Sequence, residues 1–150
     1  MNTSDGVDLA TRRAIEDLLT EFAWRADHGR ADIVHELFTE DGSIRGPGLD
    51  MRGRAEIAAR FAERAADPQR VSRHAWSNPR FERLDDDAVR VVTIVQTSIH
   101  RLEPGQSLPA EACTFVVGDS DDVVVRGPDG QWRFRSRELV VAFRIERGTP

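Results

Sequence analysis

The chain has 150 residues, of which 39% are apolar and 31% charged, with a formal net charge of -5. This composition is typical of one globular domain over residues 1–150 and excludes a disordered or fibrous chain. No apolar run approaches the roughly 20 residues that cross a bilayer, and the N-terminal residues lack a secretory pattern, so we expect a cytoplasmic protein with no membrane partner.

Two residue types are missing, and their absence excludes several kinds of site. All 21 basic residues are Arg, and the chain has no Tyr. A Schiff-base lysine, a phosphate-loop lysine and a tyrosine that donates to an oxyanion are therefore excluded. The lone Cys113 has no second thiol for a disulfide, redox pair or zinc site. Scattered arginines in an acidic chain argue against a nucleic-acid surface, so we expect a small-molecule ligand or a protein partner.

The first 70 residues carry mainly helical periodicity. Apolar residues over 9–26 recur at three- and four-residue spacing, which predicts an amphipathic helix. A shorter pattern over 33–38 predicts a second helix, which the turn sequence 39–42 closes. A short strand and loop follow over 43–52, and a third helix is predicted around 57–65.

Beyond residue 70 the apolar period becomes that of strands. Four extended segments are predicted, separated by turn sequences: 71–84, 88–102, 111–126 and 131–145. They exceed the usual strand length of about 5 to 6 residues, so we expect bends or bulges, with a break at 118–120. The order predicts an α+β fold in which three helices cover one face of a curved, mainly antiparallel mixed sheet.

The segment 89–99 also predicts an association between chains. Both of its alternating sets are largely apolar, with Val91 and Val95 in one set and Val92 and Ile94 in the other. Helices cover only one face of such a sheet, so we expect the other face to meet a second subunit in a homodimer.

Five short motifs follow one another along the chain: WRADHG at 24–29, LFTEDG at 37–42, GRAEI at 53–57, RHAWSN at 73–78 and DGQWRF at 129–134. In this order they resemble the SnoaL-like group of the nuclear transport factor 2-like superfamily, over about residues 8 to 145. The resemblance implies a cone, in which a strongly curved sheet surrounds a pocket closed by the helices. Similar proteins include ketosteroid isomerase, scytalone dehydratase, lindane dehydrochlorinase, polyketide cyclases and non-catalytic binding modules, so the fold alone names no reaction.

The resemblance also implies a catalytic set. Scytalone dehydratase and lindane dehydrochlorinase pair an aspartate at the end of the first helix with a histidine on the first long strand, and Asp27 and His74 match these positions. The dehydrochlorinase has an arginine on its last strand that assists the leaving group, and Arg137 matches it. The pocket lysine of the dehydrochlorinase falls at Phe22, and the pocket tyrosines of related enzymes are missing, so their mechanisms do not carry over whole.

Such a set has a physical basis of its own. A neutral imidazole accepts a proton near pH 7, because the ordinary pKa of histidine is about 6.5. A carboxylate bonded to one ring nitrogen fixes the tautomer and stabilises the imidazolium formed at the other. An arginine then offsets negative charge on an enolate or a departing oxygen, which suits elimination, isomerisation or aldol-type cyclisation.

Each member also has a structural interpretation. Asp27 can bond backbone or a neighbouring arginine, and His74 can be a core histidine. Arg137 shares strand parity with Arg133 and Arg135, so all three can form a solvated stripe.

Five further residues are candidate substrate contacts. Trp24, Phe61 and Phe115 are candidate pocket walls, with core packing as the alternative. Trp76 and Asn78 share parity with His74, which predicts that they line the same face. The alternatives are a core role for Trp76 and a bend at Asn78 before a proline.

No metal or cofactor site is expected. His28 and His35 are two helical turns apart, but a glycine interrupts the helix between them. The acidic run at 119–122 lacks the glycine and the later glutamate of a calcium loop, and predicts a turn or bulge instead. We interpret His35 and His100 as surface or structural residues.

Together these features predict a cofactor-independent lyase or isomerase for a small, largely apolar molecule with a carbonyl or hydroxyl group. One alternative is a binding module that holds such a ligand without turning it over. Another is an accessory subunit, as in the small subunits of ring-hydroxylating dioxygenases, which resemble this fold.

Overall fold

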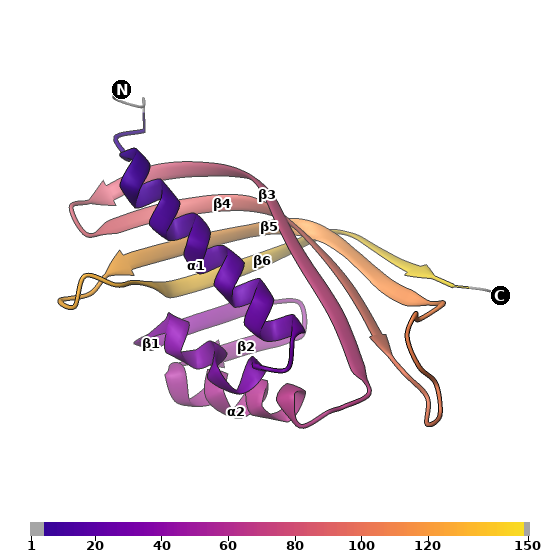
Figure 1. The fold of residues 1–150 in the computed structure, drawn as a ribbon. Coiled ribbons are helices and arrows are strands. Elements are labelled where there is room, and N and C mark those ends of the chain that lie inside the picture. The colour runs from indigo at the N-terminus through magenta and orange to yellow at the C-terminus, as the bar shows by residue number, and fades with distance from the viewer. Residues whose placement is uncertain (1–4, 149–150) are drawn as a thin grey trace.

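Helices and a curved sheet form two layers in the computed structural model, which describes residues 5–148 (Figure 1). The elements in chain order are α1 (Leu9–Asp27), the 3₁₀ helix η1 (Ala31–Leu37), β1 (Phe38–Gly46), β2 (Leu49–Arg52), α2 (Arg54–Ala65), β3 (Arg70–Asp85), β4 (Ala88–Arg101), β5 (Cys113–Arg126) and β6 (Trp132–Arg147). The strands of this part of the chain pair in the order β2-β1-β6-β5-β4-β3. Only the β1–β6 pairing is parallel there, so the predicted α+β architecture with a mixed, mainly antiparallel sheet is confirmed.

The first helix lies across one face of the sheet (Figure 1). Its N-cap, Asp8, accepts a hydrogen bond from the Thr11 N–H at 2.9 Å, which satisfies one of the free amides of the first turn. Ile15, Leu18 and Leu19 face the sheet and are buried. The helix therefore runs from the far end of β3 toward its beginning, where Asp27 closes the last turn.

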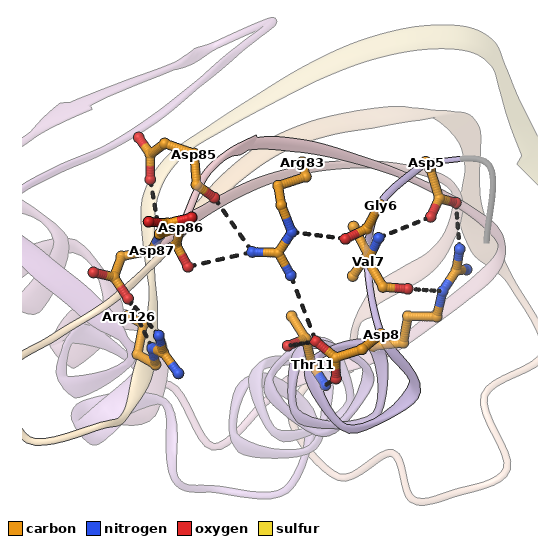
Figure 2. Close-up of polar contacts among 11 residues, drawn as sticks. Asp5, Gly6, Val7, Asp8, Thr11, Arg83, Asp85, Asp86, Asp87 and Arg126 are labelled. Atoms are coloured by element: carbon orange, nitrogen blue, oxygen red, sulfur yellow. Dashed lines mark hydrogen bonds and ion pairs between the residues drawn. The ribbon is translucent and has the colours of Figure 1, made fainter. Parts of the chain in front are cut away.

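A group of polar contacts holds the start of α1 against the β3–β4 hairpin (Figure 2). Arg83 of β3 donates to the carbonyl of Gly6 at 2.8 Å and to those of Asp85 and Asp86 at 3.3 and 3.2 Å. The same guanidinium forms an ion pair with Asp8 at 3.5 Å. One side chain thus fixes the helix start and the hairpin together, and this fixes where the other end of α1 meets the sheet.

Four phenylalanines form the centre of the core between the layers. The ring of Phe22 on α1 lies 5.9 to 6.2 Å from the rings of Phe38, Phe61 and Phe134, in edge-to-face arrangements. Phe38, Phe61 and Phe134 are buried and come from β1, α2 and β6. This cluster joins both helices to the sheet.

The predicted second helix is present as the 3₁₀ helix η1, but two other sequence predictions about local structure are wrong. Residues 39–42 belong to β1 instead of a turn. Residues 118–120 do not interrupt β5, because the extra residue lies opposite, at Ala142 of β6. Gly118 instead permits a close approach, since a Cβ there would lie 2.1 Å from the Val140 carbonyl oxygen.

The outer face of the sheet carries exposed apolar side chains near the end of β6. Val140 and Phe143 are 63% and 62% exposed, and Ile145 is 44% exposed. No helix within residues 5–148 combines the length and the apolar character needed to span a membrane. Residues 1–4, which contribute to the predicted lack of a secretory signal, lie outside the described residues.

Candidate active site

Asp27 and His74 are in direct contact where the end of α1 meets the beginning of β3. The Nδ1 atom of His74 lies 2.6 Å from the Asp27 Oδ1 atom. The His74 backbone N–H donates to Asp27 Oδ2 at 2.6 Å, and the Ser72 hydroxyl donates to Oδ1 at 2.7 Å. Three hydrogen bonds therefore hold the carboxylate, and both of its oxygens are used.

Burial and hydrogen bonding act in opposite directions on this carboxylate. The side chain of Asp27 is only 3% exposed, and burial raises its pKa. The hydrogen bonds and positive charge of His74, together with the Ser72 hydroxyl, more than offset this and hold the pKa of Asp27 below its ordinary value. Asp27 is therefore ionised at neutral pH.

The ionised carboxylate determines which ring nitrogen of His74 is free. Because Asp27 accepts from Nδ1, the neutral imidazole carries its proton there, and Nε2 keeps its lone pair. No hydrogen bond to Nε2 occurs within residues 5–148. The side chain of His74 is 22% exposed, so Nε2 is an accessible proton acceptor with a carboxylate behind it.

His74 lines a cavity of about 380 Å³ between α1, α2 and the inner face of the sheet. The walls are mostly apolar, and they include Leu19, Phe22, Met51, Val95 and Leu139. This volume lies within the range of small-molecule sites. Another hollow, more open and about 610 Å³ in size, is lined by Arg70, His100 and Cys113 but not by His74. The Asp27–His74 pair therefore belongs to the smaller of these two cavities.

Arg137 lines the same cavity and forms a buried ion pair. Its Nε donates to Asp122 Oδ1 at 3.1 Å, its Nη2 lies 3.1 Å from Asp122 Oδ2, and Nη2 donates to Ser120 at 3.3 Å. The guanidinium lies over the rings of Phe22 and Phe134, at 4.2 and 4.5 Å from their centres. Burial raises the pKa of Asp122, and Arg137 and Ser120 oppose this rise. The cation is therefore held in one position by its partners.

A bulge in β6 turns Arg137 inward. Val125 pairs with Arg133 and Val124 with Phe134, but Val123 pairs with Ser136, so Arg135 is an extra residue. Arg137 consequently shares the inner face with Phe134, whereas Arg133 binds Asp129 and Arg135 is exposed. The shared parity of the three arginines, and with it the predicted solvated stripe, does not hold.

The five predicted substrate contacts divide into two groups. Phe61 and Trp76 line the cavity. Trp24 is 61% exposed and stacks on His28 at 4.0 Å, outside it. Phe115 lies on the outer face of the sheet, where the Arg147 guanidinium covers its ring at 4.4 Å.

Asn78 lies at a bulge in β3, away from the cavity. The pairing shifts between Ser77 and Arg80, and Asn78 has a φ of 52°, in the left-handed region. This breaks the alternation that would have placed Asn78 beside His74, so the predicted bend before Pro79 describes its position. Trp76 precedes the bulge and keeps the parity of His74.

Several residues of the site were not predicted from the sequence. Ser72 shares parity with His74, and this signal could have found it. Asp122 was hidden in the acidic run assigned to a turn, although it directly precedes a run of three valines, which are typical of strands. Within residues 5–148 no group of three or more His, Cys, Asp or Glu side chains is arranged to hold a metal ion.

Comparison with known proteins identifies the family and the fold. Residues 7–138 match the family model described as a SnoaL-like domain. No curated protein matches the chain in sequence. Among solved structures, a proposed scytalone dehydratase from Novosphingobium aromaticivorans is 23% identical, with a TM-score of 0.78 over 95% of this chain and 91% of that one.

Two further solved structures that resemble this chain are of named proteins. ActVI-ORFA from Streptomyces coelicolor is 21% identical, with a TM-score of 0.73 over 89% of this chain and 98% of that one. The type 2 hexachlorocyclohexane dehydrochlorinase LinA is 17% identical, with a TM-score of 0.78 over 95% and 92%. At such low identity these likenesses establish the fold and leave the reaction to the residues of the site.

Proposed function

The chain belongs to the SnoaL-like domain family, and we propose that it is a cofactor-independent lyase or isomerase. Its substrate would be a small, largely apolar molecule with a carbonyl or hydroxyl group. The observation that carries the proposal is the 2.6 Å contact between Asp27 and the Nδ1 atom of His74, beside a mostly apolar cavity. It gives the cavity one oriented proton acceptor.

In the proposed mechanism Nε2 of His74 removes a proton from a carbon next to the substrate carbonyl. The resulting imidazolium is stabilised by Asp27, which is already ionised and does not take the proton itself. The electron pair moves to the carbonyl oxygen, and the Arg137 guanidinium offsets its charge. Nη1 of Arg137 has no hydrogen bond within residues 5–148, so its two N–H groups are available to that oxygen.

Hydrogen–deuterium exchange at carbon tests this proposal without knowledge of the natural substrate. In D₂O, 2-tetralone exchanges the protons next to its carbonyl, and proton NMR follows their loss. We expect the protein to accelerate this exchange and His74→Asn to reduce the acceleration by about 10²–10⁴-fold. His28→Asn is the matched control, because His28 stacks on Trp24 outside the cavity.

The outcomes separate the proposal from its main alternative. Exchange that survives in His74→Asn, or is not accelerated by the wild-type protein, would contradict the His74 base. The absence of lysine and tyrosine favours a non-catalytic binding module as a second candidate. For that module, binding of 2-tetralone by calorimetry without accelerated exchange is the expected result.

We further propose a homodimer formed through the outer face of the sheet. Val140, Phe143 and Ile145 are exposed there, next to Phe115 and Val117 of β5. Apolar surface of this kind marks an association site. The cytoplasmic location stays a prediction from the sequence.

A further inference from the structure

Two arginines of the cavity have no carboxylate partner among residues 5–148. Arg64 in the last turn of α2 and Arg70 at the start of β3 both line the cavity. Neither forms an ion pair within residues 5–148. By contrast, Arg137 is bound to Asp122, and Arg144 lies 3.6 Å from Glu146. The cavity therefore holds two guanidinium groups whose charge the described side chains do not neutralise at contact distance.

These two cations are held in surroundings that do not favour them. Both are half-buried, and the Arg64 guanidinium lies over the Phe61 ring at 4.4 Å. Burial, with the nearby charges of Arg70 and Arg60, lowers the pKa of Arg64 to about 10. Burial also lowers the pKa of Arg70, although the negative charges of Asp67 and Asp27 act to raise it. Both remain charged at neutral pH, so an anion placed between them would relieve an existing repulsion.

The position of Arg70 connects this pair to the proposed base. Arg70, Ser72 and His74 alternate along an uninterrupted part of β3, so they share its inner face. Asp27, which binds His74, is near enough to attract Arg70. A group bound by Arg64 and Arg70 would therefore lie at the His74 end of the cavity.

We infer that Arg64 and Arg70 form an anion subsite and that the molecule bound in this cavity is a carboxylate with an apolar body. The mostly apolar walls and the volume of about 380 Å³ fit such a body. Planar guanidinium groups match the two oxygens of a carboxylate. In this inference the carboxylate only positions the bound molecule, and the carbon that reacts belongs to another part of the same molecule. This inference rests on the proposed function only in taking the cavity as the substrate site.

A pair of matched ligands tests the subsite. Calorimetry would compare 2-naphthoate with its neutral isostere 2-naphthamide at low ionic strength. We expect the wild-type protein to bind the carboxylate at least about tenfold more tightly, which corresponds to about 1.4 kcal/mol. The double variant Arg64→Gln/Arg70→Gln should lose this preference while binding the amide as before. The control double variant Arg13→Gln/Arg30→Gln, which removes the same two charges from exposed positions, should keep the preference.

Equal binding of the two ligands by the wild-type protein, or binding of neither, would overturn the inference. So would a preference for the carboxylate that survives in the double variant. Failure of the proposed function has a different signature, because His74→Asn leaves Arg64 and Arg70 in place. If the protein binds the carboxylate selectively but shows no exchange that depends on His74, the anion subsite is supported and the catalytic proposal is contradicted.

Discussion

Asp27 is the charged group that orients the imidazole, and its replacement by Asn is expected to change the pH dependence of stability. Burial raises its pKa, but the contacts of His74 and Ser72 lower it to below the ordinary value. A carboxyl with a lowered folded-state pKa contributes stability above the unfolded pKa of about 3.9, and this contribution is lost as the pH falls through the folded-state value. We expect Asp27→Asn to lower the free energy of unfolding at pH 7 by about 1–3 kcal/mol.

Urea denaturation of both proteins measures this difference, which should shrink as the pH falls below about 4. Asp32→Asn is the control, since Asp32 is 55% exposed, and its effect at pH 7 should stay within about 0.5 kcal/mol. A difference between wild type and Asp27→Asn that is constant throughout the acid range would contradict the stated cause.

The ion pair of Arg137 and Asp122 predicts a strongly non-additive double variant. Breaking a buried pair leaves one charge uncompensated, so Arg137→Met or Asp122→Leu alone should cost about 3–5 kcal/mol of unfolding free energy. The double variant Arg137→Met/Asp122→Leu should cost less than either single change. Chemical denaturation of all four proteins completes the cycle, and additive losses would show that the two side chains do not act as a pair.

Sequence reasoning predicted the residues of the site unevenly. The meeting of Asp27 and His74 was expected from the resemblance, because it depends only on where the first helix ends and the first long strand begins. Strand parity placed Asn78 on the wrong face and did not support the inward position of Arg137, which only the resemblance indicated, because a bulge near each residue resets the alternation. A single extra residue leaves no mark in the periodicity. The pairing of Asp122 with Arg137 depends on strand register, which the sequence does not display.

At the scale of elements, the backbones of β5 and β6 come so close at Gly118 that only a residue without a Cβ fits there. A Cβ at this position would meet the Val140 carbonyl oxygen at 2.1 Å, so the backbone must shift. We expect Gly118→Ala to lower the free energy of unfolding by about 3 kcal/mol. Gly105→Ala is the control, since no atom lies within 4 Å of its added Cβ and only its φ of 88° opposes the change; about 1 kcal/mol is expected there. Thermal unfolding that ranks the two variants in the opposite order would show that the strand approach is looser.

Most elements were predicted because their periods are long and regular. The first helix and all four long strands lie within two residues of their expected ends. Residues 39–42 were mistaken for a turn because they end in Asp-Gly, which is typical of turns. Phe38 and the residues from Ser43 onward pair with β6, so this segment instead forms an irregular stretch within β1. Such a partner, more than 90 residues away, is invisible to a local pattern.

At the scale of the whole molecule, the exposed apolar face predicts how the chain associates. Phe143 is 62% exposed on the outer face, and a charge there should prevent contact with a second copy. We expect a dimer for the wild-type protein and a folded monomer for Phe143→Asp in sedimentation velocity runs. Leu9→Asp should remain dimeric, since Leu9 begins α1 on the other side of the sheet. A wild-type monomer, or a dimer that tolerates Phe143→Asp, would contradict this interface.

The layered arrangement matters for chemistry because it brings one imidazole, one carboxylate and one apolar cavity together. Nitrogen-15 NMR of histidine-labelled protein over a pH series tests that arrangement most directly, with the His74 signal assigned from its loss in His74→Asn. In the neutral form of the ring, the expected result is a proton on Nδ1 and none on Nε2, and a loss of this tautomer preference in Asp27→Asn. A His74 ring protonated at Nε2, or one unaffected by Asp27→Asn, would contradict the account.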